Sequence, residues 1–194
     1  MNTTTEKVMQ AVQDYKAVAD AHGIEKEKLD SQQRSGLIAP VEFLSKTEAN
    51  NSRLNQAIIE RVQRMNEIVS EYQQDYDEWA TVKGSETTED MALLTSGMTL
   101  DPEDYTKLET KHSGNYTMLK AIKSHAERNK VSYVASAAIE KEPKVKALLE
   151  LIGVAKNAYT ETSGAFSMND IIFSDDAEFM KWYGSLDRMI SLGE

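Results

Sequence analysis

The amino-acid sequence predicts an all-α protein: a long helical hairpin or coiled-coil arm followed by a smaller helical bundle. Among 194 residues there are only three prolines and nine glycines, so long stretches contain no helix breaker. In one stretch, apolar residues follow at spacings of 4, 3, 4, 3, 4 and 3, the a/d pattern of a helix that packs along a seam against another helix. These seam residues are Ile58, Val62, Met65, Val69, Tyr72, Tyr76 and Trp79.

The first 82 residues are predicted to form the arm from two helices. Thr3 and Glu6 have the spacing of a capping box at a helix start, and Gly23 is the predicted stop. Between them the same seam spacing recurs at Val8, Val12, Tyr15, Ala19 and His22. Pro40 suits the first position of a second helix that continues to about Val82. About 40 helical residues make a rod of roughly 60 Å, which is longer than one small domain covers.

The seam of the second helix therefore needs a covering helix along its length. The first helix is a candidate within the chain, and a second copy of the chain is a candidate between chains. The seam spacing of the second helix allows a covering helix from the same chain or from a second copy. We therefore expect the seven seam residues to act as a self-association surface.

The second half is predicted to be a linker, residues 83–90, followed by a helical bundle over residues 91–194. The linker contains Gly84 and no apolar residue. The segment Val131–Ile139 fits either a strand or a buried helix, and we predict a helix because no partner strand is visible. Helix starts are predicted at Asp101-Pro102, Asn115, Pro143 and Ser174. The last helix is apolar over a broad arc, which predicts a partner-binding surface made of Phe179, Trp182, Tyr183 and Leu186.

Charge and composition indicate which partners and which cellular location to expect. The net charge of −10 disfavours binding to nucleic acid, because phosphates repel an acidic protein. The chain has no cysteine, its first residues lack the apolar core of a signal peptide, and no apolar stretch approaches the roughly 20 residues of a membrane span. These features predict a soluble cytoplasmic protein that does not enter a membrane.

The sequence offers no constellation that points to catalysis. Glu109 and His112 have the Glu-x-x-His spacing of helical di-iron proteins, but neither His22 nor His125 has a glutamate three residues before it. There is no Gly-x-Ser-x-Gly elbow and no glycine-rich phosphate loop. We therefore expect no enzymatic activity, no metal and no cofactor.

The segment Leu100–Asn129 resembles stretches in helical proteins encoded in the head-assembly regions of tailed phages and prophages. The shared pattern is a Pro-Glu helix start at Pro102-Glu103, a short loop, and an Asn-Tyr-Thr-Met segment at residues 115–118 that enters a second helix. The resemblance implies a scaffold-like or accessory protein of virion assembly in the host cytoplasm. Its partners would be proteins, including further copies of itself.

Two alternative functions remain at this stage. The acidic charge suits an inhibitor that mimics nucleic acid in the basic groove of a host enzyme. The segment Asp101–Asn129 also has the outline of a helix-turn-helix DNA-binding regulator, with Lys120, Lys123 and Arg128 on its second helix. In that register Lys120 falls at a normally buried aliphatic position, so the motif fits in outline and fails in detail.

Overall fold

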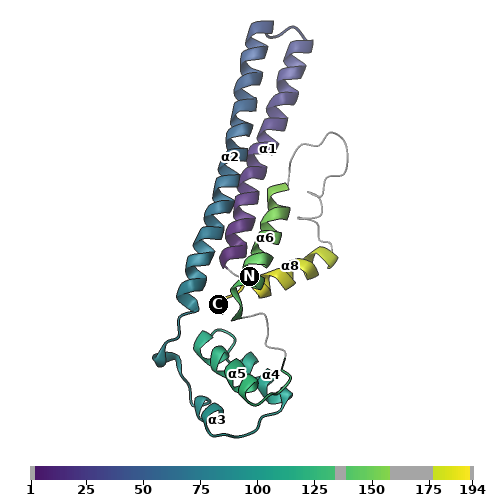
Figure 1. Ribbon diagram of the computed structural model, residues 1–194. Coiled ribbons are helices and arrows are strands. Elements are labelled where there is room, and N and C mark those ends of the chain that lie inside the picture. The colour runs from purple at the N-terminus through teal and green to yellow at the C-terminus, as the bar shows by residue number, and fades with distance from the viewer. Residues whose placement is uncertain (1–2, 134–138, 158–176, 193–194) are drawn as a thin grey trace.

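The computed structural model describes residues 3–133, 139–157 and 177–192, and every regular element within these ranges is a helix (Figure 1). The predicted all-α class is therefore confirmed. The elements are α1 (Thr3–Arg34), α2 (Pro40–Trp79), the short 3₁₀ helix η1 (Gly84–Glu86), α3 (Met91–Thr95), α4 (Pro102–Lys111), α5 (Tyr116–Arg128), α6 (Lys141–Asn157) and α8 (Ala177–Ile190).

The long helices α1 and α2 form the predicted antiparallel hairpin. α2 begins at Pro40, as the sequence indicates. The predicted stop at Gly23 is wrong, because α1 continues to Arg34 and the buried Leu29 holds its last turns against α2. The chain instead turns at Gly36, whose φ of 70° lies in the left-handed region that glycine adopts without strain. One local glycine signal was thus outweighed by packing further along the helix.

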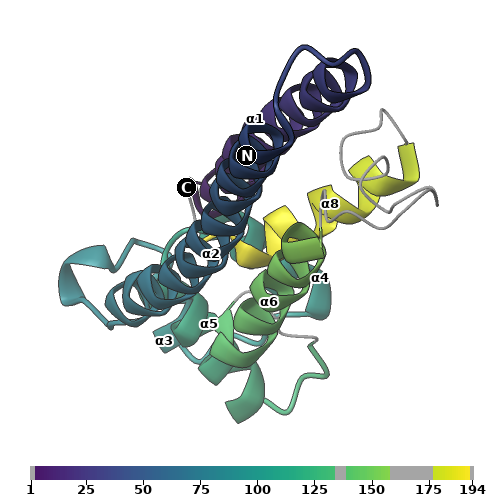
Figure 2. The same ribbon diagram turned by 90° about the horizontal axis from the view of Figure 1, so that it is seen from above.

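The lower half of the hairpin belongs to a four-helix core. Figure 2 shows α6 and α8 on the same side of the hairpin, where they pack against α1 and α2. The buried residues of this core come from all four helices: Val8, Ala11, Val12, Met65, Ile68, Tyr72, Ala147, Leu148, Leu151, Ile152, Ala155, Tyr183, Leu186 and Ile190. Toward the tip, no other described helix covers α1 and α2 (Figure 1). We call this half of the hairpin, residues 16–62, the arm.

A second, smaller core holds α3, α4 and α5 together below the hairpin (Figure 1). The two caps predicted within this core are confirmed: the Asp101 carboxylate accepts from the backbone N–H groups of Glu103 and Asp104, and Asn115 accepts from the N–H of Met118. The buried residues of this core are Leu94, Leu100, Tyr105, Met118, Ile122 and Ala126. α6 and α8 pack on the hairpin instead, so the described helices after residue 90 are divided between two cores.

Two predicted features fall wholly or partly outside the described residues. Ser174 lies outside them, and so does the centre of Val131–Ile139, at residues 134–138. The predicted linker at residues 83–90 contains η1 and contacts α5. In that contact Asn115 donates from its side chain to the carbonyl of Glu86 at 2.6 Å.

Candidate interaction surfaces

The lower part of the predicted seam is buried inside a single chain. Met65, Tyr72 and Tyr76 are almost fully enclosed. The Tyr72 hydroxyl donates to the carbonyl of Ile190 at 2.8 Å, and the Tyr76 hydroxyl donates to the carbonyl of Ile139, also at 2.8 Å. In this fold these three side chains offer no surface to a second copy. Self-association of the chain stays a prediction, but it would have to use another surface.

The buried face of α2 is also rotated away from the predicted seam. Ile68 and Arg61 are buried, whereas Val62 is 36% exposed and Val69 only half-buried. A straight helix has 3.6 residues per turn, so a strict heptad drifts by about 20° per repeat unless the helices supercoil. Here α1 and α6 contact different flanks of α2, and the buried face follows both of them.

Arg61 is a buried charge that no sequence pattern predicted. Its guanidinium lies 3.8 Å from the ring centroid of Tyr15 and donates to the carbonyl of Lys156 at 2.8 Å. Burial lowers the pKa of this guanidinium. The side chain joins α1, α2 and the C-terminal end of α6, which makes it a structural link.

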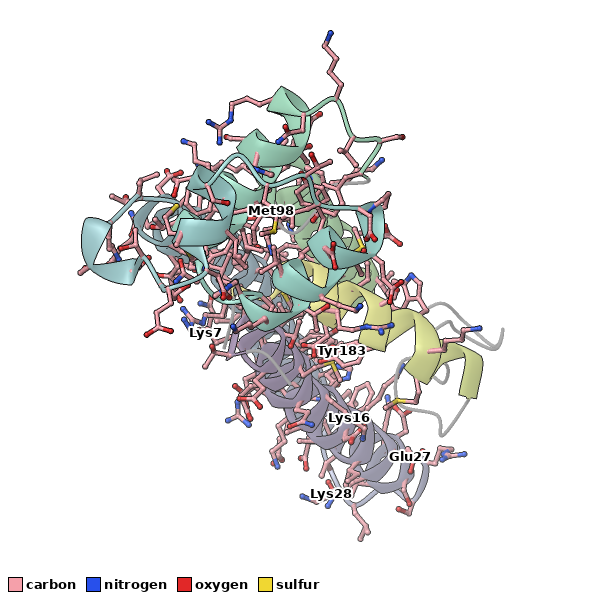
Figure 3. All side chains as sticks on the ribbon, turned by 90° about the horizontal axis from the view of Figure 1, so that it is seen from below. Lys7, Lys16, Glu27, Lys28, Met98 and Tyr183 are labelled. Atoms are coloured by element: carbon pink, nitrogen blue, oxygen red, sulfur yellow. The ribbon has the colours of Figure 1, made fainter. Side chains whose placement is uncertain are left out.

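The predicted partner surface on α8 largely faces the protein interior. Tyr183 and Leu186 are buried in the four-helix core, and Figure 3 shows Tyr183 on α8 beside the hairpin. Trp182 is partly buried, and its indole N–H donates to the Glu150 carboxylate at 3.1 Å. Phe179 belongs to α8, but its side chain lies outside the described residues. The broad apolar arc of α8 therefore reflects packing within the chain, and partner binding through α8 stays a prediction.

A buried lysine fixes the C-terminal end of α8. Lys144 on α6 is 2% exposed, and burial lowers the pKa of its ammonium to about 8. It donates to the carbonyl of Met189 at 3.0 Å and also to the carbonyl of Ser191. Together with the hydroxyl of Tyr72, it supplies donors to three consecutive carbonyl groups. This arrangement caps a helix end and requires no ligand.

The ionisable groups of the small core also have structural partners. The Tyr105 hydroxyl lies 2.7 Å from Nδ1 of the buried His125, and burial lowers the pKa of this imidazole. Nε2 of His112 lies 2.7 Å from the Asp90 carboxylate, whereas Glu109 accepts from the hydroxyl of Tyr133. The Glu-x-x-His pair thus bonds to two different partners. Within the described ranges, no three His, Asp or Glu residues are placed to hold a metal ion.

The centre of the arm contains a polar layer. Nε2 of His22 lies 3.0 Å from the side-chain oxygen of Asn51, and the amide of Asn50 donates to the carbonyl of His22 at 3.0 Å. On one side of this layer, a groove of about 430 Å³ is lined by His22, Lys26, Leu29, Asp30, Thr47, Asn50, Asn51, Leu54 and Asn55. This polar lining gives the arm a weaker apolar core than the lower hairpin.

Apolar side chains of the arm are instead exposed on its outside. On α2, Val41 is 79% exposed, Leu44 is 66% exposed and Ile59 is 51% exposed. Leu37 in the tip loop and Ile24 on α1 are exposed as well. Figure 3 shows charged residues along α1 toward the tip, among them Lys16, Glu27 and Lys28. The α2 side of the arm therefore carries its largest group of uncovered apolar residues.

No protein family, curated protein or solved structure matches this chain. Among the described helices, none is both long enough and apolar enough to cross a lipid bilayer.

Proposed function

We propose that this chain is a non-enzymatic assembly protein that binds other proteins, in the first place copies of itself, through its arm. One observation carries the proposal: the arm extends beyond the four-helix core and exposes Val41, Leu44, Ile59 and Val62 along α2. Uncovered apolar residues grouped on one element are typical of protein-interaction sites. The proposed binding surface is thus the side of α2 that carries these four residues, in place of the predicted seam and α8.

Two further observations support this proposal. The buried ionisable groups described above bond to one another or to backbone carbonyls, as structural groups do. In addition, residues 100–129 resemble helical proteins of phage head-assembly regions, which favours a scaffold-like or accessory role in virion assembly in the host cytoplasm. The acidic charge suits transient contacts with protein partners and disfavours nucleic acid.

The test is the solution mass of the full chain, measured by light scattering across a dilution series. We expect a dimer or larger species that dissociates on dilution, because the uncovered area on the arm is modest. A monomer at every concentration would contradict self-assembly. The nucleic-acid-mimic inhibitor would then be the better interpretation of this acidic chain.

A further inference from the structure

The outer flank of α2 has a pattern that reads the same from both ends. Starting at the tip, the spacings along it are 3, 4, 7, 4 and 3, so these positions share one side of the helix. The flank consists of Val41, Leu44, Glu48, Asn55, Ile59 and Val62. Two apolar residues stand at each end, and polar residues fill the middle. Reversing the direction leaves these spacings and the order of apolar and polar residues unchanged.

We infer that two copies of the chain dimerise by packing this flank of α2 against itself, antiparallel, about a twofold axis between Asn51 and Ser52. The inference rests on the proposed function, and it names the partner, the surface and the register. An isologous interface requires a self-complementary surface, and this pattern supplies one. Each residue of the flank in one copy then faces a defined residue of the second copy: Val41 faces Val62, Leu44 faces Ile59, and Glu48 faces Asn55.

The polar middle suits this register. Each end of the contact joins apolar side chains, while the amide of Asn55 can donate to the carboxylate of Glu48 in the second copy. A shift by one turn would place these polar groups against Leu44 or Ile59 and leave them without partners. Polar residues within a helical seam fix register in this way.

The flank is also the upper continuation of a surface that α6 already covers. α6 runs antiparallel to α2 and is anchored at both ends on it: Lys141 contacts Asp77 at 2.5 Å, and Lys156 donates to the side chain of Asn66 at 3.2 Å. Asn66 stands four residues beyond Val62, one turn further along the same side. α6 ends at Asn157, and no other described helix covers the flank above it. The α2 helix of a second copy would extend the line of α6 toward the tip.

The available area indicates a reversible dimer. From tip to Val62 the contact extends over about 30 Å of helix. Val41, Leu44, Ile59 and Val62 are 79%, 66%, 51% and 36% exposed, which at about 100 Å² of apolar area per side chain gives roughly 500 Å² for two copies. The polar middle brings the interface near the roughly 1,000 Å² at the lower limit of specific complexes. We therefore expect dissociation on dilution in the micromolar range.

A charge-pair experiment tests the register. Leu44→Glu and Ile59→Lys each place a charge opposite an apolar side chain, and each is expected to weaken dimerisation at least tenfold. In the double variant every introduced carboxylate faces an introduced ammonium of the other copy, so most of the affinity should return. Leu149→Glu, at a half-exposed position on α6, is the matched control and should leave the dimer unchanged. Helicity by circular dichroism should be the same in all four variants.

Disulfide crosslinking tests the axis independently, because the chain contains no cysteine. Ser52→Cys places its two thiols next to the axis and should yield a covalent dimer on oxidation. Arg53→Cys is the control, since one residue turns the helix by about 100° and points this thiol away from the flank.

The two readouts separate the possible failures. A wild-type chain that stays monomeric contradicts the proposed function itself. The wild-type chain could instead form an oligomer whose affinity is unchanged by both charge substitutions, or one that crosslinks equally through both cysteines. Either result would contradict the α2 interface but not the assembly role. Loss of the dimer in the single variants without recovery in the double variant overturns the antiparallel register.

Discussion

Replacement of Lys144 by methionine should destabilise the fold by about 2 kcal/mol at neutral pH. The substitution keeps most of the length of the side chain and removes the donors that cap α8 at Met189 and Ser191. Two hydrogen bonds from a charged group contribute about 3–6 kcal/mol together. Against this, holding the ammonium where its pKa is about 8 instead of 10.5 costs about 3 kcal/mol, and methionine avoids that cost. The lost hydrogen bonds are therefore expected to outweigh the relieved burial of charge.

The pH dependence of stability identifies the buried ammonium as the cause. Its pKa is lower in the folded chain than in the unfolded one, so between about pH 8 and pH 10 the unfolded state binds more protons. This group therefore makes the folded state more stable as the pH rises through that window, and its full cost is present below pH 8. Lys144→Met lacks this contribution, so the difference in stability between wild type and variant should widen from pH 8 to pH 9.5.

Urea unfolding followed by circular dichroism at several pH values measures both effects. In thermal unfolding at neutral pH, the same loss of about 2 kcal/mol should lower the melting temperature by about 4–8 °C for a chain of this size. Leu149→Met, at an exposed position on the same helix, is the control and should leave both stability and its pH dependence unchanged. A Lys144→Met variant as stable as wild type at pH 7, or one with an unchanged slope above pH 8, would refute the reasoning.

Three further outcomes follow from the small core. Tyr105→Phe should lower the free energy of unfolding by about 1–2 kcal/mol in urea titrations, because the buried His125 loses its hydroxyl partner. Asn115→Ala removes the cap that accepts from the Met118 N–H and should cost about 1 kcal/mol, whereas Ser at this position should retain most of the stability. Acidification from pH 7 to pH 5 should destabilise the chain through His125: burial lowers its pKa below 6.5, so the unfolded state takes up the proton first, and a His125→Gln variant should show a shallower decline.

Local signals in the sequence predicted the helix ends well where the signal lay within one turn. Asp101, Pro102 and Asn115 act as expected, since a cap needs only a side-chain acceptor and the next backbone N–H groups. Gly23 shows the limit of this reasoning. A glycine costs a helix interior only about 1 kcal/mol, and burial of Leu29 against α2 offsets that cost. The start of α2 at Pro40 was predictable because proline suits the first turn of a helix, where its missing N–H has no intrahelical partner to lose.

The surfaces were harder to predict because they depend on which helices meet. The spacing from Ile58 to Trp79 indicates an apolar face, but it does not say whether α1, α6 or a second copy covers it. Burial of Arg61 follows from Tyr15 and the end of α6, which are distant in sequence. Likewise, the apolar arc of α8 gave no sign that Tyr183 would face the interior.

The composition of the arm links its packing to its proposed role. Its centre places His22 and Asn50 between the two helices, where the lower hairpin has Met65 and Ile68, while the outer flank of α2 exposes Leu44 and other apolar residues. Two helices that pack polar groups against each other gain little hydrophobic stabilisation. Part of the apolar surface of the arm thus lies on its outside, where no other described helix covers it. Under the proposed assembly role, a second copy would cover this surface and so add to the stability of the arm.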